Sequence, residues 1–265
     1  MKKLFYLTCL IMLFTSCEKE VTLDLANKSG TLVIEGNITD QPGPYYVDIT
    51  RSVPFTNTNQ YPPVTDAFIT ITDMQGQTDT LQHIGEGRYQ TGNLHSVPGH
   101  TYNLLVKTAD ISFTAQSKMP AAVDLESLQQ DPVQMGSDTS YNVLPIFTDP
   151  APLGNRYFFI LTVNGHTKKV LQTISDNVNN GLVNQRSIIT SREEDDEIKV
   201  GDRVNVEMQC VDERMYNYYT ALIQITADRG PGGSVTPANP PSNISSGALG
   251  YFSAHTTRSS SIEIR

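Results

Sequence analysis

The run of five acidic residues at 193–197 is a dense group of chemically active side chains. Carboxylates can bind Ca²⁺, which takes about six to eight oxygen ligands from a loop that folds back on itself. The run lacks the spaced D-x-D-x-D-G pattern of a calcium loop, and successive side chains of an extended strand point to opposite faces. We therefore expect the segment 192–197 to be an exposed hairpin tip whose charge discourages edge-to-edge pairing of chains.

The histidine and serine patterns give no catalytic site. The five histidines are His83, His95, His100, His166 and His255. None of them falls at zinc-ligand spacing, and H-E-x-x-H is missing. G-x-S-x-G is also missing, and the glycines at 230–233 lack the Lys-Ser/Thr of a phosphate-binding loop. We expect no catalytic residue, no metal and no cofactor, with a triad assembled from distant residues as the alternative.

Tyrosine is the most informative aromatic residue, because the chain has twelve tyrosines and no tryptophan. A tyrosine side chain is apolar along its ring and polar at its hydroxyl, which suits binding interfaces. Tyr216 falls in a predicted helix, whereas Tyr251 and Phe252 follow a long Gly/Pro-rich loop. We expect these three residues to form a partner-binding or ligand-binding face, with ordinary packing as the alternative.

Cys17 follows a positively charged start and an apolar stretch, residues 4–14. These are the parts of a secretory signal, and the stretch is too short to span a bilayer, which needs about 20 apolar residues. The sequence "FTSC" resembles a lipoprotein signal peptidase site, apart from Phe14 at the position usually taken by Leu. This resemblance implies that residues 1–16 are removed and that Cys17 carries the lipid, which anchors the chain in a bilayer.

The positions of the other cysteines are consistent with a lipid anchor at Cys17. Cys9 would leave with the signal and Cys17 would be acylated, so Cys210 would have no disulfide partner. Cys210 alternates with polar neighbours in a predicted strand, so we expect a small core residue. The formal net charge of −9 argues against nucleic-acid binding, which uses a basic surface. The acidic segment 18–20 resembles the signal that takes Bacteroidota lipoproteins to the cell surface.

Short stretches with two-residue alternation follow a tether at residues 17–30. The predicted strands of this part are 31–37, 45–51, 67–73, 79–85, 101–107 and 111–118. Turn sequences such as Gln41–Pro44 and Val97–Gly99 separate them. This pattern predicts an immunoglobulin-like or transthyretin-like β-sandwich over residues 31–118.

The remainder, 119–265, is predicted to be a second β-rich domain with one helix. The predicted strands are 141–149, 156–165, 187–192 and 202–212, and the stretches 249–257 and 260–265 are expected to be edge strands. The helix is expected at 213–228, because Asp212 is a suitable N-cap and Met215 and Tyr219 fall at helical spacing.

Several longer stretches resemble a known family. The sequences are "LVIEGNITD", "FTDPAPLGNRYFFILTVNG" and, most specifically, "NPPSNISSGALGYFSA". They resemble a family of Bacteroidota outer-membrane lipoproteins that is catalogued as a domain of unknown function, of the DUF4249 type. The resemblance covers nearly the whole chain after residue 16. It implies an N-terminal sandwich like the regulatory domain of carboxypeptidases, and genes that lie beside those of TonB-dependent transporters. It implies no catalytic residues.

From these observations we expect an outer-membrane lipoprotein that is exposed at the cell surface. It would act without catalysis, as an accessory or ligand-capturing partner of a TonB-dependent transporter. The alternatives are a structural or adhesive surface lipoprotein and a cryptic hydrolase. Co-purification of a large β-barrel protein separates the first alternative from our expectation, and a pocket with convergent carboxylates or a Ser-His pair would favour the second.

Overall fold

The computed structural model describes residues 30–54, 60–135, 138–177, 180–190, 197–226 and 239–265. The signal segment 1–16, Cys17 and nearly all of the predicted tether lie outside the described residues, as do residues 192–196 of the acidic run. The described part is mainly β, with an N-terminal β-sandwich followed by a second β-rich part and one long helix, as the sequence predicted.

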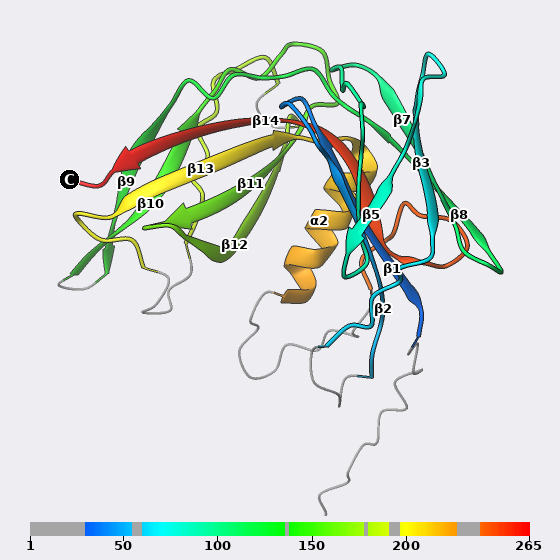
Figure 1. Cartoon of the computed structure of the whole chain (residues 1–265). Helices are drawn as coiled ribbons and strands as arrows, with labels where there is room; N and C mark the ends of the chain where they lie inside the picture. The colour runs from blue at the N-terminus through cyan, green and yellow to red at the C-terminus, as the bar shows by residue number, and fades with distance from the viewer. Residues whose placement is uncertain (1–29, 55–59, 136–137, 178–179, 191–196, 227–238) are drawn as a thin grey trace, which may run out of the picture.

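The strands of the described residues form three sheets (Figure 1). The eight-stranded sheet has the order β12 (His166–Ser175), β11 (Arg156–Val163), β13 (Arg203–Cys210), β14 (Leu249–Glu263), β1 (Leu32–Thr39), β2 (Tyr46–Arg51), β6 (Arg88–Gln90), β5 (Gln82–Gly85). The four-stranded sheet has the order β4 (Thr78–Thr80), β3 (Phe68–Asp73), β7 (Thr101–Lys107), β8 (Ser112–Lys118). The hairpin β9 (Ser127–Met135) and β10 (Asp138–Ile146) forms the third sheet.

The four-stranded sheet packs against the β1–β2–β6 part of the eight-stranded sheet. Both sheets contribute buried side chains to one core, among them Ile34 and Val47 from the large sheet and Ile69 and Leu104 from the small one. Side chains of a strand alternate between its two faces, so the residues between the buried ones point outward. The outer face of the four-stranded sheet is therefore made of residues such as Thr70, which lies next to Ile69.

The C-terminal half has a core of its own. Tyr157 and Phe159 of β11 and Val206 of β13 pack with Val143 of β10, so the β9–β10 hairpin covers one face of the large sheet. Phe158 points the other way and packs against helix α2 (Glu213–Thr226). The large sheet in this half is thus covered on one face by the hairpin and on the other by the helix.

Strand β14 joins the two halves. Its residues 249–255 pair in parallel with β1, and its residues 256–263 pair antiparallel with β13 (Figure 1). The prediction of separate edge strands at 249–257 and 260–265 is therefore wrong, because β14 is one continuous strand in the middle of the sheet. Gly250 permits the close approach to β1: its φ is +88°, and an added Cβ would lie 2.1 Å from the carbonyl oxygen of Ile34.

Residues from the end of the chain also complete the core of the first sandwich. Ile244, Ala248, Phe252 and Ala254 are buried in the same core as the strands of the N-terminal half. The boundary between 31–118 and 119–265 stays a prediction. The structure adds that the two parts share a strand and several core residues.

Helix α2 begins where the sequence predicted. Oδ1 of Asp212 accepts a hydrogen bond from the backbone N–H of Met215 at 2.9 Å, which is the N-cap interaction. Met215 and Tyr219 are the buried residues of the helix, as their spacing indicated. The end of the predicted range, residues 227 and 228, lies outside the described residues.

Candidate functional site

Two residues of the predicted aromatic face, Tyr216 and Tyr251, lie in a packed cluster at the joint of the two halves. We call Phe158, Tyr216, Tyr218, Tyr219 and Tyr251 the tyrosine cluster. The rings of Phe158 and Tyr219 are stacked, with centroids 3.9 Å apart and planes 5° apart. The ring of Tyr251 lies 5.0 Å from that of Tyr218 and 5.9 Å from that of Tyr219. Helix α2 is therefore held on the large sheet by aromatic packing.

Burial affects the hydroxyl groups of this cluster. It raises the pKa of Tyr218 to about 12, and it raises the pKa of Tyr219 well above its ordinary value, because the charged phenolate is poorly solvated there. The Tyr251 hydroxyl accepts a hydrogen bond from Nδ2 of Asn37 at 3.3 Å, so it connects β14 to β1. The raised pKa values keep the hydroxyls of Tyr218, Tyr219 and Tyr251 neutral at physiological pH.

The three residues that the sequence put forward take different places. Tyr216 is half-buried, and the guanidinium of Arg156 lies 5.6 Å from the centroid of its ring. Tyr251 is also half-buried. Phe252 is a correction: it is fully buried in the sandwich core, where Gly36 of β1 leaves room for its ring. The alternation along β14 turns Phe252 away from Tyr251, so it lies on no binding face.

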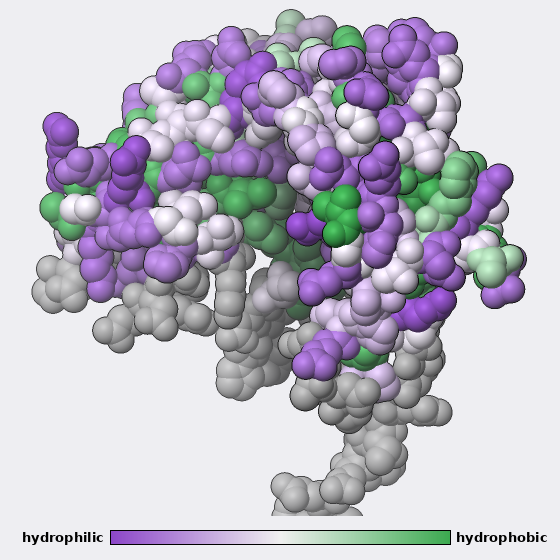
Figure 2. Space-filling view, viewed as in Figure 1, coloured by the Kyte–Doolittle hydropathy of each residue, from purple (hydrophilic) through white to green (hydrophobic). Residues whose placement is uncertain are grey.

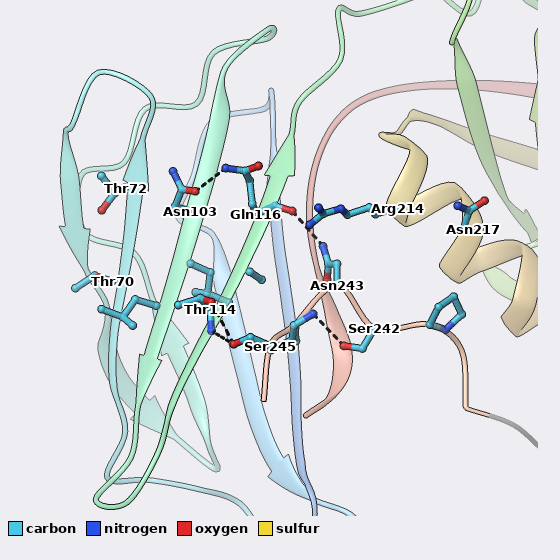
Figure 3. Close-up of a pocket in the computed structure, with 15 residues that line it drawn as sticks. Thr70, Thr72, Asn103, Thr114, Gln116, Arg214, Asn217, Ser242, Asn243 and Ser245 are labelled. Atoms are coloured by element: carbon cyan, nitrogen blue, oxygen red, sulfur yellow. Dashed lines mark hydrogen bonds between the residues drawn. The ribbon is translucent and has the colours of Figure 1, made fainter. Parts of the chain in front are cut away.

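A second region forms an open groove of about 720 Å³. We call it the composite groove, because its lining comes from three parts of the chain: the outer face of β3, β7 and β8, the first turns of α2, and the segment 241–245 (Figure 3). Its polar side chains on the sheet are Thr70, Thr72, Asn103, Thr114 and Gln116. Arg214 and Asn217 come from α2.

Strand register places the sheet residues of the groove in rows. Thr72 of β3 pairs with Asn103 of β7, which pairs in turn with Gln116 of β8. Nε2 of Gln116 donates a hydrogen bond to Oδ1 of Asn103 at 2.9 Å, which orients both amides. In the next row, Leu105 lies between Thr70 and Thr114. The floor of the groove is thus a flat array of hydroxyl and amide groups with one apolar residue.

The segment 241–245 forms a wall of the groove by covering the edge of β8. The backbone N–H of Ser245 donates to the carbonyl of Thr114, and its Oγ accepts from the N–H of the same residue, both at 2.8 Å. Asn243 holds the wall to β14: its side chain donates to the carbonyl of Phe252 at 2.7 Å and accepts from its N–H at 2.9 Å. The backbone groups of β8 along this edge are therefore already in use.

Asp212 positions α2 against the groove. In addition to capping the helix, its Oδ2 accepts hydrogen bonds from Oγ of Ser117 at 2.7 Å and from the N–H of Lys118 at 3.0 Å. One carboxylate therefore connects the end of β8 to the first turn of α2. Two residues later, the side chain of Arg214 extends from the helix toward Gln116 and Asn243 (Figure 3).

The family of the chain follows from a comparison of its sequence with family models. Residues 18–261 match the family described as "Domain of unknown function (DUF4249)". The chain belongs to the DUF4249 family. A comparison with curated proteins finds no match.

Two solved structures resemble this DUF4249 chain weakly. One is the two-domain fibronectin type-III segment of chicken tenascin, at 11% identity, covering 69% of this chain and 91% of that chain with a TM-score of 0.22. The other is the adhesin InvE of Yersinia pseudotuberculosis, at 15% identity, covering 68% of this chain and 57% of that chain with a TM-score of 0.23. TM-scores this low carry no argument about the function of the DUF4249 chain.

The groove of the DUF4249 chain has a simple charge pattern. Among the described residues, its lining includes one guanidinium, from Arg214, and no carboxylate, imidazole or thiol. Within the described ranges, no three His, Cys, Asp or Glu side chains come close enough to hold a metal ion. In the same part of the chain, no helix has the length and apolar character needed to cross a membrane. The groove is therefore equipped to form hydrogen bonds and one ionic contact.

A serine–histidine pair does occur on β14. Oγ of Ser253 lies 2.9 Å from Nδ1 of His255. Both side chains are buried, and burial lowers the pKa of His255 to about 4. The imidazole is therefore a weak base, and the serine hydroxyl is not exposed to a substrate.

The sequence reasoning did not single out the composite groove. Its floor residues occupy alternate positions of strands, which are ordinarily solvent-exposed, and its walls come from distant parts of the sequence, α2 and the segment 241–245. A usable signal was present: along β3 the outward residues after Phe68 are Thr70 and Thr72, and neither carries a charge. An outer strand face without charged side chains is a feature that a sequence can reveal.

Proposed function

We propose that this DUF4249 chain is a lipid-anchored outer-membrane protein of a Bacteroidota cell, exposed at the cell surface, that assists a TonB-dependent transporter by binding a ligand. It acts without catalysing a reaction. The bilayer and the transporter are its partners, and nucleic acid is not. The proposal combines an anchor, which the sequence supports, with a binding surface, which the fold supports.

The anchor rests on Cys17. The charged start and the apolar stretch before it are typical of an export signal, and the family match begins one residue after it, at residue 18. The described residues begin at Gly30, where the tether predicted from the sequence at 17–30 ends. Acyl chains on one residue hold a chain to a membrane because each buried methylene contributes about 0.8 kcal/mol.

The binding role rests on the composite groove. Its floor belongs to a sheet, and its walls are fixed by hydrogen bonds of Asn243 and Asp212, so the groove exists before a ligand arrives. Its hydroxyl and amide side chains do not change their charge between pH 5 and 8. They are suited to holding a ligand for transfer to a transporter.

Acylation is tested by labelling cells with radioactive palmitate. We expect the wild-type chain and a Cys210→Ala variant to be labelled, and a Cys17→Ala variant to remain unlabelled and to keep residues 1–16. Cys210 is a suitable control because it is a buried core residue that should not be modified. Equal labelling of the wild type and Cys17→Ala would refute the anchor.

The association with a transporter is tested by affinity purification of the full chain from detergent-solubilised membranes. We expect one large β-barrel protein to co-purify in a constant ratio with the wild type. The Cys17→Ala variant, expressed at the same level, is the control for association that requires the membrane. Recovery of the labelled chain without any β-barrel protein would support a structural or adhesive lipoprotein instead.

A further inference from the structure

The composite groove presents hydrogen-bonding groups that the protein itself does not use. The bond from Gln116 to Asn103 occupies one atom of each amide and leaves Nδ2 of Asn103 and Oε1 of Gln116 without a partner in the described part of the chain. The side chain of Asn217 likewise has no hydrogen bond among the described residues. Donors and acceptors therefore lie side by side on one surface. A ligand with hydroxyl groups, each of which both donates and accepts, matches such a surface.

Arg214 adds one positive charge to this surface. Its side chain is exposed and has no ion pair or hydrogen bond within the described ranges, and Figure 3 shows it extending over the groove. The planar guanidinium suits a carboxylate, which it can bind through two parallel hydrogen bonds. Lys118 is exposed on the same face of β8, two residues after Gln116 along the strand. The positive charge at the groove therefore favours a ligand that carries a carboxylate.

The overall charge of the chain does not prevent this. The formal net charge is −9, but interactions between exposed charges are screened beyond about 8 Å at physiological ionic strength. Of the nearby carboxylates, Glu213 is paired with the guanidinium of Arg156 at 3.2 Å, and Asp212 directs its oxygens to Ser117 and to backbone N–H groups while keeping its charge. Among the described residues that line the groove, Arg214 is the one that carries a charge.

A peptide that adds a strand is a poorer occupant. Such peptides bind through the free backbone groups of a sheet edge. At the groove the edge belongs to β8, whose backbone is already bonded to Ser245 and whose Ala115 forms a bridge with Ile244. Recognition must come from side chains on the sheet face, with half-buried Leu105 as an apolar contact for one face of a ring.

We infer that the composite groove binds an acidic oligosaccharide, with a carboxylate of the ligand on Arg214 and its hydroxyl groups on the amides of β7 and β8. The volume of about 720 Å³ falls within the range of small-molecule sites. This inference rests on the proposed binding role and names the ligand class of that site.

The test is isothermal titration of the full chain, purified in detergent, with three probes: trigalacturonic acid, its methyl ester, and the tripeptide Glu-Glu-Glu. The ester has the same ring hydroxyls but no charge. We expect the acid to bind at least about tenfold more tightly than the ester, because a charged hydrogen-bonded contact is lost. We expect no binding of the tripeptide.

Two variants locate the site. Arg214→Gln should reduce the affinity for the acid by about tenfold or more and leave that for the ester unchanged. Arg203→Gln replaces another exposed arginine, on β13, and should change neither. Asn103→Leu should reduce the affinity for the acid and for the ester alike, by about fivefold, because both ligands lose one hydrogen bond to the amide. Each variant is checked for an unchanged thermal unfolding curve.

The results are decisive in either direction. Equal binding of acid and ester, preferential binding of the tripeptide, or an effect of Arg203→Gln equal to that of Arg214→Gln would each overturn the inference. If no sugar binds while Cys17 is acylated and a β-barrel protein co-purifies, the ligand class is wrong and the anchored accessory role stands. If sugar binds but neither of those results is obtained, the proposed role falls and the sugar site stands.

Discussion

The tyrosine cluster and the composite groove lie on either side of helix α2 and differ in what surrounds their side chains. The cluster is aromatic and closed: Phe158 and Tyr219 are stacked and buried. The groove is polar and open, and its Arg214 and Asn217 are exposed. Figure 2 shows apolar side chains in a hollow between the two halves and mainly hydrophilic ones around it. The difference assigns stability to the cluster and recognition to the groove.

The strongest test of this difference between the two regions changes one residue on each side of the same helix. Tyr219→Ala removes a buried ring that stacks on Phe158, and we expect the free energy of unfolding to fall by about 3–5 kcal/mol. Asn217→Ala, two residues away and exposed, should change it by less than about 0.5 kcal/mol. Urea denaturation followed by circular dichroism measures both.

Equal losses for the two variants would contradict the division. A loss of sugar affinity in Asn217→Ala without a loss of stability would sharpen it, because the groove would then depend on a residue that the fold does not need.

The second prediction concerns His255, which is buried where β14 passes from one half to the other. Burial lowers its pKa to about 4, and this outweighs the opposite effect of the nearby Asp40 carboxylate. In the unfolded chain the pKa is about 6.5, so the unfolded state binds the proton first as the pH falls. The contribution of neutral His255 to the free energy of unfolding is therefore fully present above about pH 6.5. It is lost as the pH falls from 6.5 to 4, by about 3 kcal/mol in all.

His255→Gln should remove this part of the pH dependence, whatever its effect at neutral pH. His95→Gln, which changes an exposed histidine, is the control and should keep the wild-type slope. The measurement is the free energy of unfolding from urea titrations between pH 4 and pH 7.5. An unchanged slope in His255→Gln would show that the joint contains no buried neutral imidazole.

The sequence predicts the N-terminal half better than the joint. Strands such as β3 and β7 alternate cleanly, so Ile69 and Leu104 could be placed in the core from their spacing alone. Strand β9 was missed because it is polar and contains Pro132, which argues against a strand. The sequence favours two edge strands in place of β14, because the two halves of this strand pair with different strands and that pairing depends on contacts far away in the sequence.

The candidate site, too, could be predicted from the sequence only in part. The aromatic residues could be found in the sequence, and the burial of Tyr219 was expected from helical spacing. The position of Phe252 depends on which face of β14 meets the sandwich, and a shift of one residue exchanges the two faces. The groove could not be assembled from spacing, because Thr114 and Ser245 meet across 131 positions.

The last and smallest prediction concerns Asp212, which serves both regions. Asp212→Ala removes the N-cap of α2 and leaves the N–H of Lys118 and the hydroxyl of Ser117 without their acceptor. Because a lost N-cap costs about 0.5–2 kcal/mol, we expect a loss of about 2 kcal/mol in the free energy of unfolding, below that of Tyr219→Ala. Thermal and urea denaturation of the two variants test this order.

The same carboxylate should affect binding through Arg214, because it fixes the first turn of α2 relative to Gln116. In a folded sample, Asp212→Ala should therefore reduce the affinity for trigalacturonic acid more than the affinity for its methyl ester. The double variant with Arg214→Gln should bind the acid no more weakly than Arg214→Gln alone, since residues that act as a unit are not additive. Strictly additive losses would mean that Asp212 supports the helix without positioning the guanidinium, and the groove would then be independent of the joint.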